Sequence, residues 1–99
     1  MNLLGEFIIK KGEEEIVAKL TLGALYRTQT QMKLRGLLDI VGKVQELDLE
    51  LVQVVFANMQ TKIKKDEILD LLNLPEALKF LSEALVQLMQ PKETKKGNE

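Results

Sequence analysis

Apolar and charged residues alternate in two short runs near the start of the chain. Residues 6–10 and 15–20 are rich in β-branched residues, and Gly12 lies between them. This pattern predicts an antiparallel β-hairpin over residues 6–20. Two strands alone are marginally stable in water, so the hairpin should pack one face on the rest of the chain or join strands of another copy. The residues expected at such a self-association edge are Phe7, Ile8, Ile9, Ile16 and Val17.

After residue 20 the spacing of apolar residues becomes helical. Thr21 is expected to cap a first helix through its side-chain oxygen. Gly23 lies inside this helix, where glycine costs about 1 kcal/mol relative to alanine. Either another element approaches it closely, or the first turn of the helix frays. The spacing over 34–41 predicts a second short helix or a bent continuation of the first, with Gly36 and Gly42 as boundaries.

A third helix is predicted after Asp48, which is expected to be its N-cap. The segment is apolar nearly all round and rich in β-branched residues, which also permits a strand. Its length and its polar residues favour a helix. Its apolar residues are Leu49, Leu51, Val52, Val54, Val55, Phe56 and Met59.

Two more helices complete the expected fold. Asp66 is expected to cap the fourth helix and Asn73 to end it, and Pro75 suits the first turn of a fifth helix. That helix carries a stripe formed by Leu74, Leu78, Leu81, Leu85 and Leu88. Residues 91–99 contain no apolar residue to bury and are predicted to be a disordered tail.

The elements together predict a mainly α (α+β) fold, with a short N-terminal β-hairpin followed by a bundle of about four to five helices. The chain has 99 residues, which suits a single domain over residues 1–90. No apolar run approaches the roughly 20 residues that a membrane-spanning helix needs. The start of the chain also lacks the order of a secretion signal.

Charge and reactive side chains narrow the function. The 14 basic and 15 acidic residues give a net charge of -1, so no overall field favours nucleic acid or an anionic membrane. Histidine and cysteine are absent, which removes the usual general base, the thiol nucleophile and the commonest metal ligands. Asp66 and Asp70 could share a helix face, but a capping role explains Asp66 better. We therefore expect no enzyme, no metal and no cofactor.

Two charged clusters are more simply explained as solvated surface. Glu13, Glu14 and Glu15 lie at the expected hairpin turn, where charge protects a strand edge, although they could also dock a basic partner. Lys62, Lys64 and Lys65 have no interleaved aromatic residue to stack on bases. They fit a polar loop that leads into a helix.

The informative feature is an excess of apolar side chains. A domain this small has a high ratio of surface to volume and has difficulty hiding so many of them. One interpretation is that all lie in a single core; the other is that some meet a partner. The candidate partner-binding residues are Val52, Val55, Phe56, Met59, Phe80 and Met89.

The run from Glu15 to Tyr26 resembles the opening of phage tail assembly chaperones, in which a short hairpin leads into a helix that starts Thr-Leu-Gly-Ala-Leu. The later parts follow in a similar order: a helix rich in Val, Phe and Met, a linker, an Asp-Glu-Ile-Leu helix and an Ala-Leu-rich helix. The resemblance covers about residues 6–90. Residues 27–31 depart from it, because they are more polar and less acidic than the family pattern.

The resemblance implies an assembly factor in the cytoplasm of a bacterial host. Such proteins cover apolar segments of the long tape-measure protein, self-associate around it and help to recruit tail-tube subunits. The expected partners are therefore the tape-measure protein, the tail-tube protein and further copies of this chain. Two other classes stay open: a small helical DNA-binding regulator, and a generic oligomerisation or adaptor domain of a bacterial complex.

Overall fold

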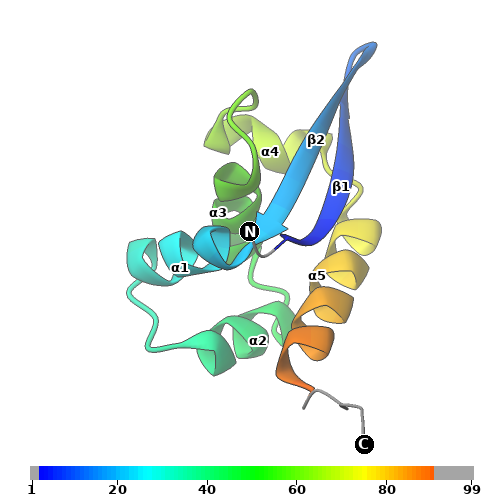
Figure 1. Cartoon of the computed structure of the whole chain (residues 1–99). Coiled ribbons are helices and arrows are strands. Elements are labelled where there is room, and N and C mark those ends of the chain that lie inside the picture. The colour runs from blue at the N-terminus through cyan, green and yellow to red at the C-terminus, as the bar shows by residue number, and fades with distance from the viewer. Residues whose placement is uncertain (1–2, 91–99) are drawn as a thin grey trace, which may run out of the picture.

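The computed structural model describes residues 3–90, and in this part of the chain a two-stranded hairpin lies against five helices (Figure 1). The mainly helical α+β fold predicted from the sequence is confirmed. The predicted tail, 91–99, lies outside the described residues. The elements are β1 (Leu3–Lys11), β2 (Glu14–Thr21), α1 (Leu22–Gln31), α2 (Leu37–Gln45), α3 (Leu49–Met59), α4 (Lys65–Leu71) and α5 (Leu74–Met89).

The hairpin has one buried and one exposed face. The two strands are antiparallel, and their two-residue turn begins at Gly12, whose φ of 64° is a conformation that glycine adopts without strain. Alternate side chains point to opposite faces of a sheet. The inner face is therefore packed on the helices, as one of the two sequence-based alternatives predicted. Its buried residues are Ile9, Ile16, Ala18 and Leu20.

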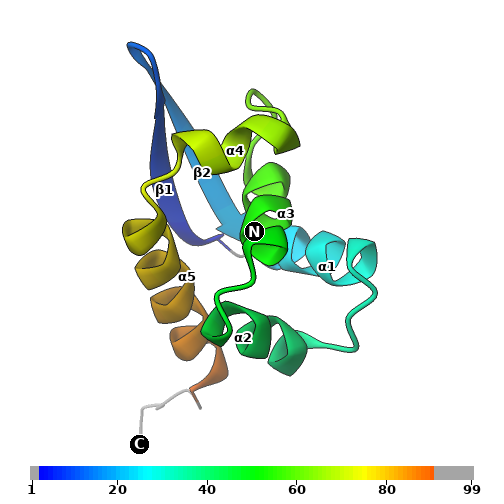
Figure 2. The ribbon, with the colours of Figure 1, turned by 180° about the vertical axis from the view of Figure 1, so that it is seen from behind.

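Helix α3 is the central helix of the domain. It contacts α1, α2, α4 and β2, and it lies between α1 and α5 when the molecule is seen from either side (Figure 2). The Asp48 carboxylate caps it by accepting hydrogen bonds from the backbone N–H groups of Glu50 at 2.9 Å and Leu51 at 3.3 Å. Packing on several sides explains why this helix is apolar nearly all round.

The first two helices are separate. Thr21 caps α1 as predicted, since its Oγ1 accepts a hydrogen bond from Ala24 N–H at 3.0 Å. Lys33 has a φ of 58°, a left-handed conformation that interrupts the helix before α2 begins.

The two glycines of these helices do not have the roles expected from the sequence. Gly42 lies within α2 and does not end it. A Cβ atom on Gly23 would meet only Arg27 and Thr21, so no other element requires that glycine.

The boundary between α4 and α5 corrects two predictions. α4 begins at Lys65 with Lys64 at the N-cap position, so Asp66 is in the first turn and is not the cap. Asn73 does not end α4, because its side-chain oxygen accepts a hydrogen bond from Glu76 N–H at 3.3 Å and caps α5. Pro75 is in the first turn of α5, as predicted.

Candidate protein-binding surface

Four of the six candidate partner-binding residues form part of the core. Val52, Val55, Phe56 and Met59 are at most 5% exposed. The neighbours of α3 cover the sides of the helix that carry these residues, so a partner cannot reach them in the folded chain. The structure therefore corrects their assignment to a partner surface.

Phe80 is a half-buried residue that holds the hairpin on the helices. Its ring centroid lies 5.3 Å from that of Phe7 and 6.4 Å from that of Phe56, and the rings of Phe7 and Phe56 are 5.4 Å apart. These are the separations of interacting aromatic pairs. The cluster joins β1, α3 and α5, so Phe80 supports the fold, and its role as a partner contact stays a prediction.

Met89 is the one candidate of this set that is exposed to solvent, at 44%. It lines a hollow of about 60 Å³ between α2 and α5, two helices that lie side by side in both views (Figures 1 and 2). The hollow is lined by Val41, Val44, Gln45, Ser82, Leu85, Val86 and Met89.

The apolar lining continues onto the exposed surface of both helices. Val86 precedes Met89 by one helical turn and is 55% exposed, and Leu38 precedes Val41 by one turn and is 70% exposed. The hollow has no charged lining residue, because Gln45 and Ser82 are its polar groups. We call Leu38, Val41, Val86 and Met89 the α2–α5 surface.

Sequence analysis missed Leu38 and Val86 as surface residues. In the sequence Leu38 is one of several apolar positions of its helix, and Val86 lies beside the leucine stripe of α5. The stripe is the covered side of α5, where Leu81 and Leu85 are buried. Val86 and Met89, one helical turn apart beside that stripe, are the pattern that could have indicated a second apolar face.

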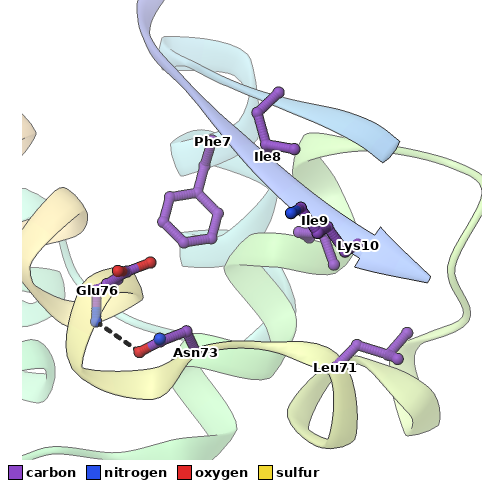
Figure 3. Close-up of a pocket in the computed structure, with 7 residues that line it drawn as sticks. All are labelled: Phe7, Ile8, Ile9, Lys10, Leu71, Asn73 and Glu76. Carbon is purple, nitrogen blue, oxygen red and sulfur yellow. Dashed lines mark hydrogen bonds between the residues drawn. The ribbon is translucent and has the colours of Figure 1, made fainter. Parts of the chain in front are cut away.

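The predicted self-association residues divide between the two faces of the hairpin. Ile9 and Ile16 are buried and Phe7 is in the aromatic cluster, so these three are corrected to inner-face residues. Ile8 and Val17 lie opposite each other and are 46% and 43% exposed. A hollow of about 430 Å³ separates β1 from the junction of α4 and α5 (Figure 3).

One salt bridge joins the two charged clusters to each other, and a second joins the hairpin to α4. Lys62 Nζ lies 3.5 Å from Glu14 Oε2, and Lys11 Nζ lies 3.2 Å from Glu67 Oε1. The tip of the hairpin is thereby linked to the loop before α4 and to α4 itself. These groups are exposed, and such pairs contribute at most about 1 kcal/mol.

Within residues 3–90, no group of three or more Asp and Glu side chains is placed to hold a metal ion. None of the described helices is long and apolar enough to cross a bilayer.

The architecture is a small α+β domain with a hairpin packed on helices and a partly exposed apolar surface between α2 and α5. Comparisons of the chain with protein-family models, with curated proteins and with solved structures found no match.

Proposed function

We propose that this protein is a tail assembly chaperone of a long-tailed phage, which binds apolar helical segments of the tape-measure protein and helps to recruit tail-tube subunits. The resemblance of residues 15–26 to that family supports the class of protein. The structural observation that carries the proposal is the α2–α5 surface, where the exposed Val86 and Met89 line an uncharged hollow with Val41, and Leu38 is exposed one turn before Val41 on α2.

The geometry of this surface suits the apolar face of a helix. A long tape-measure helix would aggregate through its apolar stripe unless that stripe were covered. The space between two neighbouring helices is a common place for a third amphipathic helix to bind. Val44 and Leu85 form an apolar floor, and Met89 adds a flexible side chain that adapts to different partners. Because the lining is uncharged, an apolar segment would leave no charge buried without a partner.

The test is a binding titration with overlapping segments of the tape-measure protein from the same phage genome, followed by calorimetry. Val86→Asp should weaken binding at least tenfold, because it places a charge in the contact. The matched control is Tyr26→Asp on α1, at a residue that is 66% exposed and outside the α2–α5 surface. Both variants should stay within about 0.5 kcal/mol of the parent in stability. Absence of binding by every segment, or equal weakening by Tyr26→Asp, would refute the proposal.

A further inference from the structure

The exposed face of each strand repeats the same order of side chains. On β1 it carries Glu6, Ile8 and Lys10, and on β2 it carries Glu15, Val17 and Lys19. Within the hairpin, each side chain of one strand lies opposite a complementary one of the other. The register places Glu6 opposite Lys19, Ile8 opposite Val17 and Lys10 opposite Glu15. An acid–apolar–base order is also complementary to itself when a strand pairs antiparallel with a copy of itself.

In β1, the residues whose backbone groups are free to pair with another strand are the same three: Glu6, Ile8 and Lys10. A two-residue hairpin loop closes on a hydrogen-bonded pair, here Lys11 and Glu14, and hydrogen-bonded pairs then alternate along the ladder. The N–H and C=O groups of Glu6, Ile8 and Lys10 consequently point away from β2. The sheet in residues 3–90 has two strands, so these groups face the free edge of β1.

The free edge of β1 is accessible. The hollow of about 430 Å³ is lined by residues 7–10 of β1 and by Leu71, Asn73 and Glu76 near the junction of α4 and α5 (Figure 3). In that view Ile8 points away from Phe7 and from the helices. An added strand could therefore approach β1 while Ile8 stays on the exposed face.

We propose that two copies of this chain pair antiparallel through the free edge of β1, with a two-fold axis at Ile8. In this register Ile8 faces Ile8 of the second copy, and Glu6 of each copy faces Lys10 of the other. A shift by two residues would place the charges opposite apolar residues, and a shift by one would turn the inner face outward. The backbone and the charges thus select the same register. Paired apolar residues and opposite charges stabilise adjacent strands.

The other edge of the hairpin is less suited to the same pairing. β2 leads directly into α1 at Leu22, and α1 runs away on the side opposite β1, so it lies near the free edge of β2 (Figure 1). This inference does not depend on the α2–α5 surface, so either proposal can fail without the other.

The absence of cysteine from the chain permits a direct test by disulfide formation. Hydrogen-bonded antiparallel pairs have Cα atoms about 5.5 Å apart, which a disulfide can bridge. Ile8→Cys should therefore form a covalent dimer under mild oxidation. Lys10→Cys should not, because two such residues would be about 13 Å apart along the strands. Val17→Cys is the matched control on the other strand. A covalent dimer of Val17→Cys, with none of Ile8→Cys, would overturn the β1 register.

Charge exchange provides a second test by sedimentation equilibrium at low salt. Glu6→Lys should weaken the dimer about fivefold or more, because it creates two like-charge pairs. Adding Lys10→Glu to that variant should restore the affinity. Lys19→Glu places two acidic residues opposite each other inside the hairpin and should leave the dimer intact. A strictly monomeric parent, or a double variant as weak as Glu6→Lys, would refute the pairing; thermal unfolding shows that each variant is folded.

Discussion

Gly5 lies directly against the ring of Phe80, so close that a Cβ atom on residue 5 would be 2.9 Å from Cε1 and 3.1 Å from Cζ of that ring. The contact follows an irregularity in the strand pairing between Leu3 and Gly5. β1 can approach α5 this closely because residue 5 has no side chain. The ring of Phe80 has no easy way to yield, since it also packs against Phe7.

This contact predicts that Gly5→Ala destabilises the protein by about 1–3 kcal/mol, the usual effect of overpacking. Gly42→Ala should have the opposite effect and stabilise by about 0.5–1 kcal/mol. Gly42 lies inside α2, and an added Cβ atom there would meet no other atom within 4 Å. Urea unfolding of both variants measures the two changes. Loss of stability in both, or in neither, would contradict the role assigned to Gly5.

Gln60 is a buried residue that organises the loop between α3 and α4. Its Oε1 accepts hydrogen bonds from the backbone N–H groups of Lys62 at 2.8 Å and Ile63 at 2.7 Å. Its Nε2 donates to the carbonyl oxygens of Phe56 at 3.3 Å and Ile63 at 3.0 Å. One side chain therefore satisfies four backbone groups.

Gln60→Ala should accordingly destabilise the protein by about 1–3 kcal/mol, because buried backbone groups lose their partners. Hydrogen exchange at the amides of Lys62 and Ile63 should become faster. Gln87→Ala, at an exposed residue of α5, is the control and should change stability by less than about 0.5 kcal/mol. Unchanged exchange at both amides would show that the loop does not depend on Gln60.

The two sides of α5 should respond differently to truncation. Leu81 is 1% exposed, and Leu81→Ala should destabilise by about 2–5 kcal/mol because it leaves a cavity. Val86 is 55% exposed, and Val86→Ala should change stability by less than about 0.5 kcal/mol. The denaturant midpoints of Leu81→Ala and Val86→Ala, compared with that of the parent, measure the two changes in stability. An unchanged midpoint for Leu81→Ala would mean that the leucine stripe is not part of the core.

Thr28 and Asn58 should be energetically coupled. The buried Thr28 hydroxyl donates to Ala24 O at 2.9 Å and accepts from Asn58 Nδ2 at 3.1 Å, which connects α1 to α3. A double-mutant cycle with Thr28→Val and Asn58→Ala should give a coupling free energy of at least about 0.5 kcal/mol. Simple additivity of the two changes would show that this hydrogen bond does not stabilise the fold.

The polar stretch 27–31 has a structural role in this contact. Asn58 Nδ2 also donates to Gln31 Oε1 at 3.2 Å, and Arg27 Nη2 donates to Asn58 O at 3.3 Å. Arg27, Thr28 and Gln31 of this stretch thus contact polar groups of Asn58 near the end of α3. Nothing in the sequence alone connects residues about 30 positions apart in this way.

The sequence by itself determined the features that depend on neighbouring residues. Thr21 and Asp48 cap helices through hydrogen bonds within three residues, Pro75 suits a first helical turn, and Gly12 suits the hairpin turn. Each of these interactions is local, so a short stretch of sequence is enough to predict it. The helix predicted after Asp48 is confirmed as Leu49–Met59, and its length exceeds that of most strands.

The tertiary structure alone decided which apolar residues are covered. Phe56 and Met89 were equivalent candidates in the sequence, but one lies in the central helix and the other beside an exposed hollow. Burial depends on contacts between elements far apart in the chain, and so does the need for glycine at residue 5. The amphipathic pattern of α5 is enough to predict its covered stripe. The α2–α5 surface could not be predicted in this way, because it forms only where α2 packs beside α5.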